Sequence, residues 1–172
     1  MDLKQVRQRC EERLRTLDLP APFDVRALCA RLARQRRRPI VLQPVASGVG
    51  CYGLWVALPT ADVIFYERET SPLHQEHIIL HEVCHLVAGH QPAPVSREDA
   101  ARLLFPDLAS ELVQRLLQRA GYSTDEEREA EVLASLILER ADRAPASGAP
   151  PRDPRTAEVL GRLEATLDAR AG

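Results

Sequence analysis

The sequence has no long hydrophobic run, and this absence argues against a membrane-spanning protein. None of its apolar stretches approaches the roughly 20 residues that a helix needs to cross a bilayer. The N-terminal segment MDLKQVRQRCEERL is charged throughout and has no apolar signal core. We therefore expect a cytoplasmic protein without membrane contact.

A dominant charge and a cysteine framework are also missing. The 23 Lys and Arg residues nearly balance the 25 Asp and Glu residues, so a net charge of −2 gives no electrostatic reason to expect direct nucleic-acid binding. The net charge does not exclude a protein or peptide partner. Four cysteines are scattered without a CxxC pair, which in a chain without a secretion signal favours reduced thiols over disulfides: Cys10, Cys29, Cys51 and Cys84.

What is present is a pattern of helices around a few short strands. At 172 residues the chain has the length of one domain with a modest tail. Apolar periodicity and capping residues predict helices at 3–17, 24–36, 73–88, 97–105, 107–119 and 124–141. Short extended segments predict a small three-stranded antiparallel sheet from residues 39–45, 51–58 and 62–67. The expected fold class is α+β and mainly helical.

The end of the chain changes in composition. Residues 1–143 are expected to form the domain, and the Pro- and Ala-rich segment 144–155 is expected to be a flexible linker. Residues 156–172 follow as a C-terminal helix with leucines on one side. That side is a candidate surface for a partner or for self-association.

The most informative segment is HEVCH, residues 81–85. Helix positions four apart lie on the same face, so His81 and His85 can direct two imidazole nitrogens at one metal ion while Glu82 stands beside them. Every other residue from 78 to 88 is apolar, which predicts a helix buried on all sides. Buried imidazoles and carboxylates are costly unless satisfied, and a divalent cation with its water would satisfy them. The alternative is two core histidines bonded to backbone carbonyls and a Glu paired with an Arg.

A catalytic zinc site generally has three protein ligands and one open position, so a third ligand is needed. The apolar stripe of the predicted helix 124–141, extended one turn back, carries Glu127 and Glu131, whereas Glu126 and Glu129 are expected to point away. We predict Glu127 as the metal ligand and Glu131 as an acceptor for a ring N–H of a ligating histidine, with the reverse assignment as the alternative. Zn²⁺ is the expected ion, with another divalent cation as the alternative.

These residues resemble the ImmA/IrrE family of metallopeptidases. The family pattern is HExxH followed by a helix of the form E-x-x-A-[N/D]-x-F-A-x-x-L-L, and this chain has HEVCH and then EREAEVLASLIL at residues 127–138. The resemblance covers about residues 20–141 and also places the third ligand on Glu127. The chain departs from the pattern at Glu131, where the family has Asn or Asp, and at Leu133, where it has Phe.

The resemblance implies a zincin-like fold and a function. Family members are zinc-dependent metallo-endopeptidases that typically cleave a helix-turn-helix repressor encoded beside them, or occur in toxin-antitoxin or phage-related gene pairs. The chain has no evident helix-turn-helix of its own, so any effect on DNA is expected to run through such a partner. The alternative is a non-catalytic metal-binding regulator or toxin-antitoxin component that acts by protein-protein binding. Retention of Glu82 favours the enzyme, because a structural site does not need it.

In the implied mechanism, Glu82 is the catalytic residue. It takes the proton of a water activated by the metal and passes it to the leaving amine. The oxyanion needs a further donor, and Tyr66, Tyr122 and His90 are candidates that the sequence does not rank. An extended substrate is expected to pair with an exposed edge of the hairpin 51–67.

Two other polar groups have a functional and a structural interpretation. His77 and His74 precede His81 by about one and two helical turns, and we favour a place on the rim of the site, or no role, over metal binding. The Arg-rich segment 31–38 could bind an acidic partner or nucleic acid, but a solvated helix C-terminus suited to cations is favoured.

Overall fold

The computed structural model describes residues 2–46, 53–96, 98–99, 112–113, 116 and 121–143. Over this part of the chain the elements follow in the order α1 (Leu3–Thr16), α2 (Val25–Arg36), β1 (Ile40–Val45), β2 (Gly53–Ala57), β3 (Asp62–Glu67), α3 (Pro72–Ala88) and α6 (Thr124–Arg143). The predicted α+β class, mainly helical with a small sheet, is confirmed.

Several predicted segments lie outside the described residues. They include the linker 144–155, the C-terminal helix 156–172 and most of the helices expected at 97–105 and 107–119. Within the described residues, no helix is both long enough and apolar enough to cross a membrane.

The sheet is mixed, so the prediction of an antiparallel sheet is wrong in this respect. The strand order is β1-β3-β2, with β3 parallel to β1 and antiparallel to β2. All six residues of β3 are buried, which suits a strand with a neighbour on each edge. β1 contains Pro44, which has no N–H to donate, and lies at an edge where this is tolerated. The fully buried strand β3 therefore lies between β1 and β2, both of which precede it in the sequence.

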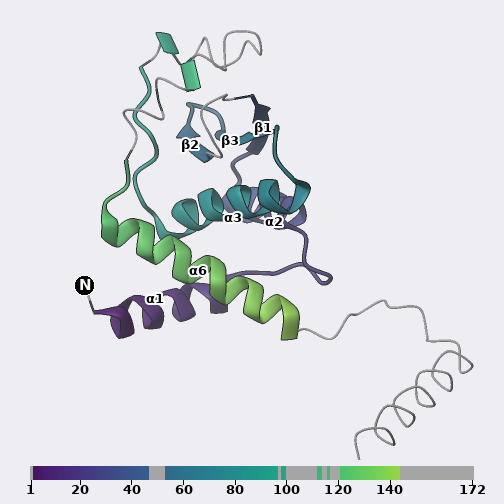
Figure 1. The fold of residues 1–172 in the computed structure, drawn as a ribbon, viewed down its shortest axis with the longest axis vertical. Coiled ribbons are helices and arrows are strands. Elements are labelled where there is room, and N and C mark those ends of the chain that lie inside the picture. Colours follow the sequence, from purple (N-terminus) through teal and green to yellow (C-terminus); the bar gives the residue numbers. More distant parts are fainter. Residues whose placement is uncertain are drawn as a thin grey trace, which may run out of the picture.

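The central helix α3 carries HEVCH beneath the sheet. The Ser71 hydroxyl accepts the N–H of His74 at the start of the helix, Pro72 occupies the first turn, and Gly89 ends the helix with a left-handed φ of 76°. From Ile78 onwards the helix is buried on nearly every side, as its apolar sequence predicts. Figure 1 shows α3 lying between the sheet and α6.

α6 and α1 pack on the side of α3 that faces away from the sheet (Figure 1). α6 begins with a capping box, in which the Ser123 N–H donates to the Glu126 carboxylate at 2.8 Å and the Glu126 N–H donates to the Ser123 hydroxyl at 3.3 Å. Leu133 and Ile137 of α6 belong to the same buried apolar cluster as Val83 of α3. This packing holds the first turns of α6 beside HEVCH.

A buried ion cluster ties the end of α2 to the sheet. Asp62 is 1% exposed and accepts from Arg36 Nη1 at 2.7 Å, Arg38 Nε at 3.0 Å and Trp55 Nε1 at 3.1 Å. Arg38 also donates to the carbonyl of Ala61 at 3.0 Å. Arg31, in the same segment, donates to Asp18 at 2.6 Å. Three of the arginines in segment 31–38 therefore have structural partners, and the solvated helix end favoured from the sequence is only part of the explanation.

Candidate metal centre

Three side chains from two helices converge at the junction of α3 and α6. His81 and His85 lie one turn apart on α3, and Glu127 lies in the first turn of α6. The Nε2 atoms of the two histidines are 3.0 Å apart, and Glu127 Oε2 lies 3.2 Å from His81 Nε2 and 3.8 Å from His85 Nε2. The structure thus brings together the three ligands predicted from separate parts of the sequence.

The spacing of these donor atoms fits a tetrahedral metal ion. Bonds of about 2.0–2.2 Å at tetrahedral angles separate neighbouring ligand atoms by roughly 3.3–3.6 Å. The separations of 3.0, 3.2 and 3.8 Å lie on either side of this range. Within the described residues, His81, His85 and Glu127 form the one group of three or more His, Cys, Asp or Glu residues whose donor atoms all lie within 4.8 Å of one another. Two imidazoles and a carboxylate are a donor set of catalytic zinc sites. The residues present therefore fit a zinc ion.

Burial keeps His85 in the neutral form that metals bind. Its side chain is fully buried, and desolvation, together with His81 and His90, lowers the pKa of His85 to about 3. A neutral imidazole retains the Nε2 lone pair at physiological pH. The ring of Tyr122 stacks on that of His85 with centroids 3.5 Å apart, which fixes the plane of the His85 ring.

Glu82 is enclosed between α3 and the edge strand β2. Its side chain is buried, and its Oε2 accepts the backbone N–H of Trp55 at 3.0 Å. Burial raises the pKa of Glu82 to about 8, although the Trp55 hydrogen bond acts in the opposite direction. Gly53 makes room for the carboxyl group, because a Cβ there would lie 2.6 Å from Glu82 Oε1. A carboxyl group that titrates near neutral pH is suited to accepting and returning a proton.

The backbone groups of Trp55 at the edge of β2 beside Glu82 are already hydrogen-bonded. The backbone N–H of Trp55 donates to Glu82, and the Trp55 carbonyl accepts the N–H of Ala93 at 3.0 Å. Strand addition by an extended substrate, expected at the hairpin 51–67, is therefore blocked at Trp55.

Among the candidate oxyanion donors, Tyr122 has the most suitable surroundings. Within the described part of the chain its buried hydroxyl has no hydrogen-bond partner, which is costly unless a ligand supplies one. Burial and the nearby charges of Glu82 and Glu127 raise the pKa of Tyr122, so it keeps the proton that it would donate. Tyr66 instead accepts from Arg26 at 3.2 Å, with the Arg26 guanidinium 5.5 Å from its ring centroid.

His90, the third candidate donor, lies behind His85. Its Nδ1 is 2.8 Å from the Nδ1 of His85, whereas the Nε2 of His85 faces His81. The Nε2 of His90 is 3.4 Å from Glu129 Oε2. His90 therefore contacts the ring nitrogen of His85 that does not face the other predicted ligands.

The two glutamates that flank Ala130 are placed opposite to the prediction. Glu129 is 5% exposed, whereas Glu131 is exposed, so Glu131 is not the acceptor behind a ligating histidine. The sequence did contain a signal for Glu129, because it lies one turn before Leu133 and two turns before Ile137, both fully buried. The prediction placed the one-turn extension of the apolar stripe on Glu127 and Glu131 instead.

The remaining candidates near HEVCH lie apart from the three predicted ligands. His74 and His77 are exposed on α3 with ring centroids 6.3 Å apart, and neither belongs to the metal-binding group. Cys84 is a buried free thiol in the core.

Comparison of the chain with protein-family models, curated proteins and solved structures gave no significant match. The resemblance to the ImmA/IrrE family therefore stays a prediction from the motif residues. The case for function depends on the geometry of the site.

Proposed function

We propose that the chain is a zinc-dependent metallo-endopeptidase in which His81, His85 and Glu127 bind the ion and Glu82 is the catalytic base. The observation that carries this proposal is the convergence of the three donors beside a buried carboxyl group on the same helix. Structural zinc sites are usually closed by four protein ligands. The described residues offer three here, and Glu127 leaves the site accessible because its side chain is 42% exposed.

The proposed reaction assigns proton transfer to Glu82. Bound zinc would supply Lewis acidity, which lowers the pKa of water and polarises a carbonyl group. The Trp55 N–H orients the carboxyl group through Oε2, and among the described residues none donates to Oε1. Glu82 Oε1 thus accepts the proton of the attacking water, and Glu82 returns it to the leaving amine.

Tyr122 is the proposed donor to the oxyanion. Tyr122→Phe removes the hydroxyl but keeps the ring that stacks on His85. We expect kcat to fall about 100-fold, the usual effect of losing one such donor, with the zinc content unchanged. Loss of zinc together with activity would instead give the hydroxyl a role in building the site.

The proposed substrate is a regulatory protein, a helix-turn-helix repressor. Its support is the resemblance of HEVCH and residues 127–138 to the ImmA/IrrE pattern, together with a net charge that gives no reason for direct DNA binding. We place the reaction in the cytoplasm. Support comes from three buried cysteines that are free thiols: Cys10, Cys29 and Cys84.

The deciding experiment is co-expression with the product of a neighbouring repressor gene. Glu82→Gln keeps an acceptor for the Trp55 N–H but removes the base, so cleavage should slow by at least about 100-fold. Glu131→Gln, an exposed change on α6, is the control and should cleave at the wild-type rate. Wild-type cleavage by Glu82→Gln would contradict the mechanism.

A second measurement tests the ligand set. Zinc content should fall in Glu127→Ala and remain in Glu131→Ala, because only Glu127 reaches the two histidines. The opposite result would reverse the assignment, and zinc retention by both variants would remove Glu127 from the ligand set.

One observation favours a second candidate function, a non-catalytic metal-binding regulator or toxin-antitoxin component that acts by protein-protein binding. Glu82 has a structural partner in Trp55, which gives it a reason to be present without catalysis. Under this alternative, the wild type and Glu82→Gln retain the same partner in a pull-down and neither releases a cleaved product.

A further inference from the structure

Behind the proposed zinc ligands, a series of polar contacts runs from α3 through α6 to α1. His85 Nδ1 meets His90 Nδ1 at 2.8 Å, and His90 Nε2 meets Glu129 Oε2 at 3.4 Å. Glu129 Oε1 accepts from Arg13 Nη1. The two imidazoles and the carboxylate are at most 9% exposed. Burial of so many polar groups in one series requires that each find a partner.

The C-terminal end of α3 holds His90 in this position. Gly89 turns the chain with a left-handed φ, and the His90 N–H then donates to the carbonyl of His85 at 3.1 Å. Arg13 Nη2 donates to the carbonyl of Ala88 at 2.8 Å, while its Nη1 binds Glu129. Arg13 therefore joins the end of α3 to α6.

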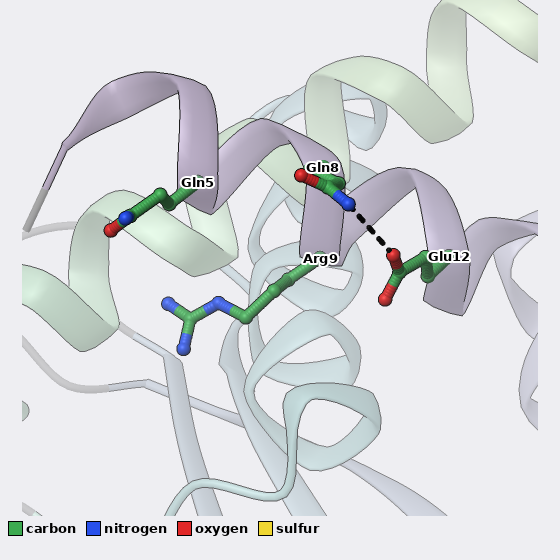
Figure 2. A pocket seen from close by; sticks show the side chains of 4 residues that line it. All are labelled: Gln5, Gln8, Arg9 and Glu12. Carbon is green, nitrogen blue, oxygen red and sulfur yellow. Dashed lines mark hydrogen bonds between the residues drawn. The ribbon is translucent and has the colours of Figure 1, made fainter.

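A second arginine supports the same carboxylate from nearer the surface. Arg9 Nη2 lies 3.4 Å from Glu129 Oε2, and its side chain is 42% exposed. Figure 2 shows the Arg9 side chain reaching away from α1 beside an open hollow that it lines with Gln5, Gln8 and Glu12. The series thus extends from a buried ligand to the surface of α1.

We propose that His90 and Glu129 are positioning residues that set the tautomer and ring orientation of His85 for zinc binding; this inference rests on the proposed zinc site. An Nε2 that binds zinc carries no proton, so the proton of His85 is on Nδ1 and donates to His90 Nδ1. His90 accepts there, so its own proton is on Nε2 and donates to Glu129. Donation from His85 to His90 and from His90 to Glu129 thus gives each of these three side chains a hydrogen-bond partner.

The arrangement also predicts an effect on affinity. An acceptor behind a ligating imidazole fixes its orientation and raises its basicity, and loss of such a partner typically costs 10–100-fold in metal affinity. His90 is the direct acceptor, and Glu129 acts through it. The two arginines of α1 hold the carboxylate in place.

The direct test reads the ring protons of the zinc-loaded full chain by long-range ¹H–¹⁵N NMR, with His90→Gln used to assign the signals. We expect His85 to be protonated at Nδ1 and His90 at Nε2. A His90 protonated at Nδ1 would overturn the inference, because two N–H groups would then face each other across 2.8 Å. The protonation states are read from the wild type, and His90→Gln serves only to assign the signals.

The second test measures Zn²⁺ affinity by competition with a chelator. We expect His90→Gln and Glu129→Gln to bind Zn²⁺ about 10–100-fold more weakly than the wild type. Glu131→Gln, exposed two residues further along α6, is the matched control and should bind as the wild type does. On α1, Arg13→Met should weaken binding, whereas Arg7→Met, which breaks only an exposed pair with Glu11, should not.

The outcomes separate this inference from the proposed function. A wild-type chain that binds no Zn²⁺ would overturn both. A wild-type chain that binds Zn²⁺ no more tightly than His90→Gln and Glu129→Gln would overturn the positioning role and leave the zinc site intact.

Discussion

Two buried polar clusters in this protein differ in how completely their members are satisfied. Asp62 accepts hydrogen bonds from two arginines and from the indole of Trp55. At the junction of α3 and α6, Tyr122 has a buried hydroxyl without a partner among the described residues, and Glu82 has a pKa raised to about 8. Among the described residues, the first cluster is complete, whereas the second is not.

The contrast agrees with a structural role for the first cluster and with the function proposed for the second. Buried polar groups in folded proteins nearly always find partners, so a buried hydroxyl without one, beside a carboxyl group with a shifted pKa, points to a ligand or substrate. Trp55 sharpens the comparison because it contributes to both clusters: its indole N–H donates to Asp62, and its backbone N–H donates to Glu82. One strand, β2, thus joins the Asp62 cluster to the carboxyl group of the proposed base.

The largest expected effect concerns the pH dependence of the metal-free protein. The folded state holds a proton on Glu82 that the unfolded state releases, so its contribution to stability is full below pH 4.5 and is lost as pH rises through about 8. At about 1.4 kcal/mol per pKa unit, the change reaches at most about 4–5 kcal/mol. Glu82→Gln should therefore gain stability relative to the wild type as pH rises across this window.

The measurement is urea unfolding in the presence of a chelator from pH 4 to 9. The lowered pKa of His85 gives an opposite trend below pH 6.5, so the difference between wild type and Glu82→Gln is the quantity to follow. Glu131→Gln should keep the wild-type profile. A difference that does not vary with pH would show that Glu82 does not titrate in this range.

The next effect breaks the structural cluster. Asp62→Asn removes the charge that balances Arg36 and Arg38, and loss of one partner in a buried ion pair costs about 3 kcal/mol when the remaining charges can partly reach water. Both arginine side chains are about a third exposed, which supports this lower value. Zinc affinity should not change. If Zn²⁺ binding weakened as well, the two clusters would be coupled through Trp55 and the contrast between them would fail.

The same comparison shows what the sequence could predict. Helix boundaries were predictable because their signals are local: Asp24 caps α2, Ser71 caps α3 and Gly89 ends it. The meeting of His81 with His85 follows from helical spacing alone. The strand order could not be predicted by pairing each strand with the next one in the sequence, because the buried strand β3 lies in the centre of the sheet, between β1 and β2.

Long-range partners explain the error at Glu129. Its charge is buried because Arg13, 116 residues earlier in the chain, reaches it from α1. A local pattern of polar and apolar residues cannot reveal such a partner, and a glutamate in a helix normally indicates a solvated face. Glu127 was predicted from the apolar stripe of the helix 124–141, extended back by one turn. His81 and His85 were predicted from the HEVCH motif itself.

The smallest expected effect tests the packing of β2 against Glu82. A Cβ at Gly53 would lie 2.6 Å from Glu82 Oε1 and 2.7 Å from its Cγ, so Gly53→Ala must displace the carboxyl group or the strand. Overpacking of this kind costs about 2 kcal/mol, and the displaced carboxyl group should also slow cleavage. Gly121→Ala is the control, because a Cβ there meets nothing within 4 Å. Urea unfolding and the cleavage assay together check both effects. Wild-type stability and activity in Gly53→Ala would mean that β2 does not need to lie this close to the proposed base.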